Sequence, residues 1–198
     1  MNGFEKRTQQ KKRKILNTAF ELFTTHGVQK VSIQEIAKKA QVSQVTIYNY
    51  FGSKEQMLVE SIKDYYMKQI ERFEKLVEDP ESDFKEKIES IITIKSDNIL
   101  SFNPDFIQTF ISDIPELQSF IQEIMETHSM PLFIKLLEEG KQQGYVQQNI
   151  SVDILMFYMN MFYEGIQKRK DLFETEESVQ KFTDEILHLF FYGVMGKS

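Results

Sequence analysis

The sequence predicts an all-α protein, with a small N-terminal three-helix head followed by a longer helical body. Two observations support this fold class. Apolar residues recur at spacings of three and four along most of the chain, which is typical of amphipathic helices, and no stretch shows the alternation of a strand. Serine, glycine and proline residues stand where such helices would begin or end. We expect residues 1–52 to form the head and residues 53–198 to form the body.

The composition fits a globular protein and limits its environment. The 198 residues are 41% hydrophobic and 27% charged, and none is cysteine. The lack of cysteine excludes disulfides and thiolate chemistry and favours a reducing compartment. No apolar run approaches the roughly 18 residues of a membrane span, and the N-terminus lacks an apolar signal core. We therefore expect a cytoplasmic protein that does not use a membrane as a partner.

Charge is divided unevenly along the chain. The net charge is −6, yet residues 1–50 hold nine lysines and arginines against three acids, so they carry +6 and the remainder −12. A basic head on an acidic body is typical of a nucleic-acid-binding protein. A basic N-terminal segment is common in other proteins, so this charge pattern supports a function only together with a motif.

The first helix is expected from about Arg7 to His26. Gly27 is placed to end it in the left-handed conformation, with Val28 as the hydrophobic contact that follows. The basic residues 11–14 lie on its opening turns, where they can approach a phosphate backbone. Its apolar stripe consists of Ile15, Leu16, Ala19, Phe20 and Phe23.

Two short helices and a tight turn are expected next. Ser32 can cap the first of them, with Glu35 closing a capping box. Gln41 and Val42 form the turn, and Ser43 caps a second helix of about two turns. The residues that the first of these helices should bury are Ile33, Ile36, Ala37 and Ala40. Two helices that cross over such a turn form a helix-turn-helix, whose second helix enters the DNA major groove.

The second short helix has an inner and an outer face. At about 100° per residue, Ile47 must face the core together with Val42 and Phe51. Amide and hydroxyl groups on the opposite face suit base edges and phosphates, and a valine can contact a thymine methyl. The residues left free to contact DNA are Gln44, Val45, Thr46, Tyr48, Asn49 and Tyr50. An ordinary solvated helix would show a similar face, so the face alone does not establish DNA binding.

The next helix opens with a second Ser-x-x-Gln box, at Ser53–Gln56. Lys54 lies in its first turn, where the helix dipole favours an anion rather than a cation. A lysine at this position indicates a phosphate partner, with a solvated lysine as the alternative.

The wider pattern resembles the TetR family of bacterial transcriptional regulators. The matching residues are Gly27, Val31, Ser32, Ile36, Ala37, Ala40, Val42, Ser43, Thr46, Ile47, Tyr48, Tyr50, Phe51, Ser53, Lys54, Glu55 and Leu58. They cover about the first quarter of the chain, which departs from the family at Gln41, usually glycine, and at Val45. The resemblance implies that Lys54 contacts a phosphate, and we count Ser32 and Ser43 among the expected DNA contacts. It also implies a helical body for ligand binding and dimerisation.

Six helices are expected in the body. Pro131 should kink the fourth of them near Met130. The expected ranges are 55–77, 84–100, a short helix from Pro104, one from about 113–116 to 143, 153–167 and 176–194.

The last two helices carry more apolar surface than one small domain can cover. The run Ile154–Met159 continues through Met161–Tyr163 and is interrupted only by Asn160. Pairing both helices with those of a second subunit would cover all faces, as in a four-helix interface, and TetR-like proteins dimerise in this way. The alternative is a large monomer core. The final helix contributes Phe182, Ile186, Leu187, Leu189, Phe190 and Phe191.

The body is also rich in aromatic residues and methionine, which suit a cavity for a lipophilic or aromatic compound. Most of these residues could equally be core. The candidate ligand contacts are Phe102, Phe106, Phe110, Met125, Phe133, Tyr158, Met159 and Phe162.

Together these patterns predict a homodimeric regulator that binds palindromic double-stranded operator DNA. We interpret it as a repressor that a small-molecule effector releases. An activator, a regulator sensing a partner protein, and an enzyme built on a helical body are the alternatives. The enzyme has little support, because the three histidines lack partners at triad or metal-ligand spacing and no glycine-rich phosphate loop is present. We expect no catalytic residue, no metal site and no cofactor.

Overall fold

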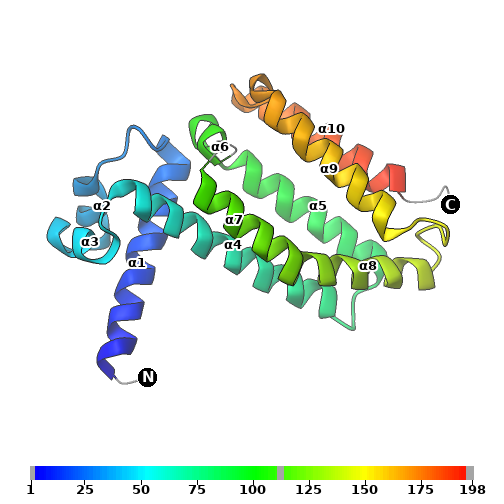
Figure 1. The fold of residues 1–198 in the computed structure, drawn as a ribbon, viewed down its shortest axis with the longest axis horizontal. Helices are drawn as coiled ribbons and strands as arrows, with labels where there is room; N and C mark the ends of the chain where they lie inside the picture. The colour runs from blue at the N-terminus through cyan, green and yellow to red at the C-terminus, as the bar shows by residue number, and fades with distance from the viewer. Residues whose placement is uncertain (1–2, 111–113, 195–198) are drawn as a thin grey trace.

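The chain folds into helices joined by short turns and loops over residues 3–110 and 114–194, which the computed structural model describes, and no strand occurs among them. This confirms the predicted all-α fold (Figure 1). The elements are α1 (Gly3–His26), α2 (Ile33–Ala40), α3 (Gln44–Phe51), α4 (Lys54–Glu78), α5 (Phe84–Leu100), α6 (Pro104–Phe110), α7 (Pro115–Ile124), the π-helical turn η1 (Met125–Ser129), α8 (Met130–Gln142), α9 (Val152–Lys168), the 3₁₀ turn η2 (Lys170–Phe173) and α10 (Glu176–Val194).

Helices α1, α2 and α3 gather at one end of the molecule, as Figure 1 shows. The long helix α4 starts among them, packs along α1, and runs into the body, where it contacts α7 and α8. Helix α5 packs against α10 in the body. One continuous helix, α4, therefore connects the three-helix head with the rest of the chain.

Serine side chains cap the starts of two head helices, α2 and α3. The Ser32 side chain accepts the Glu35 backbone N–H, and the Glu35 carboxylate accepts the Ser32 N–H at 2.7 Å, so the predicted capping box is present. Ser43 caps α3 by accepting the Thr46 N–H at 3.1 Å. The four apolar residues expected inside α2 are all buried.

The first helix begins at Gly3 rather than near Arg7, because no helix-breaking residue stands among the polar residues that follow Gly3. It ends as predicted, with Gly27 at a φ of 83°. A Cβ at this position would lie 3.2 Å from Asp105 Oδ2 and 3.3 Å from Asn103 Oδ1. The Asn103 N–H donates to the Thr24 carbonyl at 2.6 Å, so the end of α1 rests closely on the start of α6.

The long helix expected to end near Gln143 is interrupted by the π-helical turn η1, which Met130 separates from Pro131. In this turn the Met130 N–H donates to the Met125 carbonyl five residues earlier. A proline lacks an N–H and its ring crowds the preceding turn, so the backbone widens there. The predicted irregularity is therefore present, as a widened turn over residues 125–129 that comes before Met130.

The buried residues of the head share one core with the first turns of α4 and with two residues further along the body. Phe106 of α6 and Leu117 of α7, 0% and 2% exposed, belong to the same cluster as Phe23, Ile36 and Ile47. A second cluster lies at the far end of α4, among α4, α5 and α8, and includes Val77, Ile88 and Leu136. The body therefore completes the core of the head.

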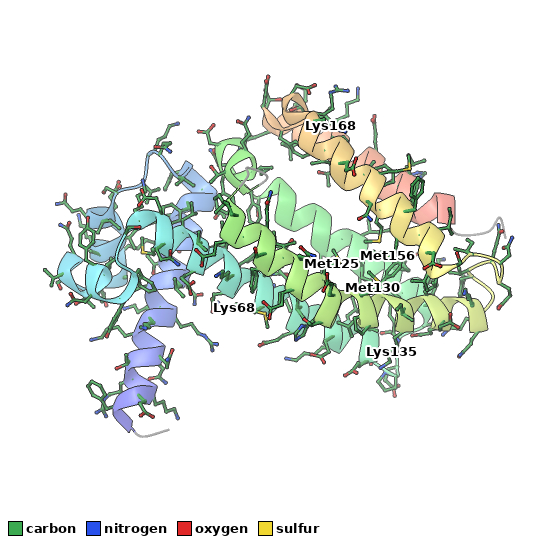
Figure 2. The ribbon with its side chains drawn as sticks, in the orientation of Figure 1. Lys68, Met125, Met130, Lys135, Met156 and Lys168 are labelled. Atoms are coloured by element: carbon green, nitrogen blue, oxygen red, sulfur yellow. The ribbon has the colours of Figure 1, made fainter. Side chains whose placement is uncertain are left out.

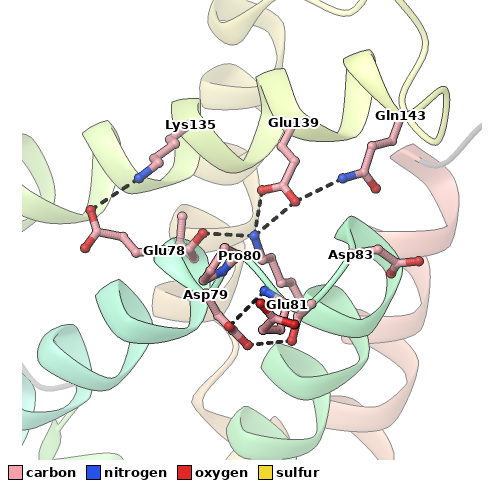
Figure 3. A pocket seen from close by; sticks show the side chains of 11 residues that line it. Glu78, Asp79, Pro80, Glu81, Asp83, Lys135, Glu139 and Gln143 are labelled. Atoms are coloured by element: carbon pink, nitrogen blue, oxygen red, sulfur yellow. Dashed lines mark hydrogen bonds and ion pairs between the residues drawn. The ribbon is translucent and has the colours of Figure 1, made fainter.

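A polar corner closes the far end of α4. The ammonium of the buried Lys87 donates to the Val77 carbonyl at 3.0 Å and to both Glu139 carboxylate oxygens, at 3.0 and 2.8 Å. Figure 3 shows these bonds at a hollow of about 440 Å³, where Gln143 also donates to Glu139. Because these groups satisfy one another's hydrogen bonds, we interpret the corner as a structural contact that links α4, α5 and α8.

Candidate nucleic-acid interface

Helix α3 presents a distinct outer face to solvent. Ile47 is 0% exposed and Phe51 is buried, whereas Val45 and Tyr48 are 66% and 49% exposed. Gln44 and Asn49 are exposed as well, and Thr46 and Tyr50 are half-buried. The inner and outer faces of α3 thus lie where the helical periodicity predicts them. Two large apolar or aromatic side chains left in water on so short a helix indicate a surface that a partner covers.

The two cap serines are exposed but already hydrogen-bonded. The Ser32 hydroxyl lies 2.8 Å from Glu35 Oε2, and the Ser43 hydroxyl lies 2.9 Å from the Thr46 hydroxyl. Each also accepts a backbone N–H of its own helix. A hydroxyl can accept a second bond or exchange its donor, so both serines can still meet a phosphate at these helix starts.

The turn between α2 and α3 has a left-handed backbone at Gln41, where the TetR family usually has glycine. Gln41 has a φ of 58° and a ψ of 48°, and its N–H donates to the carbonyls of Ala37 and Lys38. Its side-chain oxygen accepts a hydrogen bond from the Lys14 ammonium at 3.3 Å. This left-handed conformation costs about 1–2 kcal/mol for a residue with a Cβ. The hydrogen bond from Lys14 of α1 helps to stabilise it at Gln41.

A second lysine of α1 contacts the other end of α3. The Lys12 ammonium lies 5.4 Å from the centre of the Tyr50 ring, within the range of a cation–π interaction. Neither this contact nor that of Lys14 was foreseen from the sequence, where both lysines appear only as part of a basic cluster. Contacts between residues this far apart in the chain leave no local signal.

The first turns of α1 carry further exposed cations, Lys6, Arg7 and Lys11. A hollow of about 740 Å³ lies between this part of α1 and the junction of α3 with α4. It is lined by Lys6, Gln9, Gln10, Lys12, Arg13, Leu16, Tyr50, Phe51, Gln56, Glu60 and Asp64. Three cations of α1, Lys6, Lys12 and Arg13, therefore lie at this hollow beside the end of α3.

Lys54 is the first residue of α4 and is half-buried, beside the end of α3. Ser53 caps α4 by accepting the Gln56 N–H at 3.0 Å. The second half of the predicted Ser53–Gln56 box is replaced, because the Gln56 amide donates to Glu116 of α7 at 3.3 Å instead. The available carboxylate is the physical reason for this difference.

The candidate effector residues fall into separate places. Phe102 and Phe106 pack against each other at 5.4 Å and against Phe20, and Tyr65 stacks on Phe20 at 4.3 Å. Burial raises the pKa of Tyr65 to about 12, so its hydroxyl stays neutral. These four rings join α1 and α4 to the segment that holds α6.

The other candidates lie further along the body. Tyr158 and Phe162 form a T-shaped pair at 4.6 Å on α9, with Met159 half-buried between them in the sequence. Met125, labelled in Figure 2 where α7 passes into α8, lies on η1 and is 36% exposed. Phe133 packs against the second core cluster. The side chain of Phe110 lies outside the described part of the structure, as does Ile111.

Large apolar side chains remain exposed on the last two helices. Ile154, Phe157 and Met161 of α9 are 55%, 62% and 56% exposed, and they recur at spacings of three and four. Leu189 of α10 is 53% exposed. The side chains of Phe190 and Phe191, which the sequence placed in the same interface, lie outside the described residues. One face of α9 is therefore apolar and uncovered in the single chain.

Two kinds of feature are absent from the described residues. Across residues 3–110 and 114–194, no three His, Cys, Asp or Glu side chains stand close enough to hold a metal ion. None of the helices within those same ranges combines the length and the apolar content of a membrane span.

Residues 15–60 match the family model described as bacterial regulatory proteins, tetR family. A regulator of Bacillus subtilis named YuxN and described as an uncharacterized HTH-type transcriptional regulator is 39% identical over 64 residues, which are 32% of this chain and 22% of that protein. The fatty acid metabolism regulator protein of the same organism is 28% identical over 152 residues, or 74% of this chain and 76% of that protein.

A solved structure shares the fold over nearly the whole chain. The transcriptional regulator FadR from Bacillus subtilis, crystallised with stearoyl-CoA, superposes with a TM-score of 0.63 at 22% identity, covering 92% of this chain and 98% of that one. A basic three-helix head with an exposed, serine-capped α3 defines a helix-turn-helix DNA-binding protein. By its head, this chain is similar to the TetR family of transcriptional regulators, and the relatives named above are transcriptional regulators as well. Such regulators bind operator DNA, typically as dimers, and respond to small-molecule effectors.

Proposed function

We propose that this protein is a repressor that binds a palindromic operator as a homodimer and leaves it when a lipophilic or aromatic effector binds the body. The observation that carries the DNA-binding part is the outer face of α3, where Val45 and Tyr48 stand in solvent beside Gln44 and Asn49. Amides at the groove can read base edges, while the valine can meet a thymine methyl. The protein would then act in the bacterial cytoplasm, where operator DNA lies.

The roles of the head residues follow from their positions. Gln44, Val45, Thr46 and Asn49 contact bases, with Tyr48 at the edge of the face. Ser32, Ser43, Tyr50 and Lys54 stand at helix ends, where side chains reach the phosphates on either side of the groove. The exposed cations of residues 6–14 add sequence-independent attraction to the backbone. We assign the DNA-contacting role to residues 1–52 and Lys54, and the effector and dimer roles to residues 53–198.

The uncovered face of α9 supports the dimer. Ile154, Phe157 and Met161 would be covered by the same helix of a second copy, with α10 beside it, in a two-fold symmetric contact. Two heads linked in this way can engage both half-sites of a palindrome, and the linkage raises the overall affinity far above that of one head.

A long-chain acyl compound is the first effector to test. The relative that matches 74% of this chain is named a fatty acid metabolism regulator, and the FadR structure holds stearoyl-CoA. The paired rings of Tyr158 and Phe162 and the flexible Met125 and Met159 suit an apolar chain. Repression is relieved if the acyl compound binds the DNA-incompetent arrangement of the heads better than the competent one.

The test is a titration of fluorescent DNA from upstream of the gene with the purified full-length protein. We expect a saturable, sequence-specific complex that stearoyl-CoA releases and free coenzyme A does not. A complex that no acyl compound releases would remove the lipophilic effector and favour a different signal. No specific complex with any upstream or promoter fragment would contradict the DNA-binding proposal itself.

A further inference from the structure

A polar contact joins the start of α7 to the first turns of α4. Glu116, the second residue of α7, accepts a hydrogen bond from the Gln56 amide at 3.3 Å and from the Lys63 ammonium at 2.6 Å, both at Oε1. Gln56 lies in the first turn of α4, two residues after Lys54. The carboxylate of a body helix therefore holds the turn that carries the proposed phosphate contact.

The Gln56 side chain is not needed to cap the backbone at the start of α4, so it can contact Glu116 of α7. In a complete capping box the Gln56 side chain would accept the Ser53 N–H. Here the Ser53 N–H donates to the Phe51 carbonyl at 2.8 Å, so it is already satisfied. The Gln56 amide can then point across to α7 at no cost to the cap, and a local interaction is exchanged for one between head and body.

The neighbours of Glu116 and Lys63 hold this contact in place. Leu117, next to Glu116, is 2% exposed and belongs to the core shared with the head. Lys63 also lies 3.6 Å from Glu60 and 5.7 Å from the centre of the Phe120 ring. The hydrogen bonds from Lys63 and Gln56 lower the pKa of Glu116, and the bond to Glu116 raises the pKa of Lys63, so both stay charged at neutral pH. Glu116 is thus a fixed, charged acceptor.

We propose that Glu116 is a positioning residue for operator binding, which sets the angle of the first turn of α4, and with it Lys54, relative to the body. The proposal rests on the DNA-binding function proposed above. A dimer gains affinity from its second head only if both heads stand at the spacing of the half-sites. Without Glu116 the first turn of α4 loses this polar contact with α7, the head samples more orientations about the shared core, and binding must restore the right one.

Operator affinity separates this role from simple electrostatics. Removal of a carboxylate by Glu116→Gln reduces repulsion from DNA, so charge alone predicts equal or tighter binding. Positioning predicts binding about three- to fivefold weaker, the effect of a partly exposed ion pair, with an unchanged salt slope because no phosphate contact is lost. The matched control is Glu123→Gln, an exposed acid of α7 for which residues 3–110 and 114–194 offer no ion pair, and it should bind at least as well as the unmodified protein. The exchanged pair Lys63→Glu with Glu116→Lys should restore affinity.

A second measurement needs no DNA. The chain has no cysteine, so spin labels react only at cysteines introduced at the exposed positions Gln34 of α2 and Gln122 of α7. We expect the distribution of distances between the two labels to broaden in Glu116→Gln and to remain narrow in Glu123→Gln. Unchanged affinity together with an unchanged distribution in Glu116→Gln would overturn the positioning role while leaving DNA binding intact. Failure of the unmodified protein to bind any operator would count against the proposed function, and the label distances would still decide whether Glu116 positions the head.

Discussion

Gln41 shows how one residue can hold a backbone that its side chain disfavours. Among residues 3–110 and 114–194 it is the one non-glycine residue with a positive φ. The turn between α2 and α3 needs this conformation to redirect the chain within two residues, and its N–H closes α2 at Ala37 and Lys38. The contact from Lys14 partly offsets the strain, and it also ties α1 to the turn that aims α3.

Replacing Gln41 with glycine should therefore stabilise the protein. We expect Gln41→Gly to raise the free energy of unfolding by about 0.5–1 kcal/mol, since relief of the left-handed strain exceeds the extra entropy of glycine in the unfolded chain. Urea denaturation measures this change, and Lys14→Ala isolates the contribution of the side-chain contact. A variant less stable than the unmodified protein would show that the turn carries no such strain.

Substitutions of Lys54 and of Gln44 should change DNA binding in different ways. If each subunit neutralises about four phosphates, the log–log salt slope of the dimer is near −7, and Lys54→Ala should flatten it by about one per subunit. The loss of affinity should be similar on all sequences, because a phosphate contact carries no base information. Gln44→Ala should instead change the ranking of operator variants at one or two base pairs. Titrations at several salt concentrations, on a panel of operators, distinguish the two, and an unaltered slope in Lys54→Ala would exclude a phosphate contact.

At the scale of elements, the sequence predicts the starts of α2, α3 and α4 better than any other feature. Ser32, Ser43 and Ser53 each cap a helix because the hydroxyl and the N–H it accepts are only three residues apart. Such pairs are visible in a linear sequence. The destination of the Gln56 amide is not, since Glu116 is 60 residues away in the chain and only the fold brings it close.

The shape of the interrupted helix and the position of Phe106 could not be predicted from the sequence either. Both depend on contacts between distant parts of the chain. Pro131 predicts an irregularity, but whether the backbone kinks or widens depends on the packing of the turn before it. Phe106 looks like a ligand contact or a core residue from its type alone. Its position beneath the head is set by the contact between α6 and the end of α1, which no periodicity reports.

The capping box of α2 should make stability depend on pH. Hydrogen bonds from the backbone and the hydroxyl of Ser32 lower the pKa of Glu35 below its ordinary 4.5. A carboxyl with a lowered folded pKa stabilises the protein fully above its unfolded pKa, and this contribution disappears as the pH falls through the folded value. We expect the unmodified protein to be more stable than Glu35→Gln at pH 7 and the difference to shrink below about pH 4.5. Thermal unfolding across pH 7 to 3 tests this, and a difference that stays constant would contradict it.

At the scale of the whole molecule, the proposed dimer depends on the uncovered face of α9, which would link the two heads. A charge at its centre, Phe157→Asp, should prevent the subunits from associating, because burial of an unpaired carboxylate in an apolar interface costs several kcal/mol. We expect sedimentation to show a monomer whose circular dichroism is unchanged and whose affinity for the full operator falls to that of a single half-site. Gln142→Asp, the same charge on the exposed end of α8, is the control. A Phe157→Asp monomer that still binds the full operator tightly would remove the need for a dimer.

The core that Phe106 and Leu117 share with the head limits how this protein can be recombined with its relatives. A chimera cut after residue 62 would carry the proposed DNA-contacting surface but leave behind Phe106 and Leu117, two fully buried side chains of the core beneath it. Loss of large buried side chains such as these costs about 2–5 kcal/mol each, a substantial part of the stability of a small domain. A transplantable unit must therefore include the segment from Phe102 to Leu117, or a recipient body whose own residues fill the same two positions. Exchange of DNA specificity between such regulators is then a problem of matching α6 and α7 as much as of copying α3.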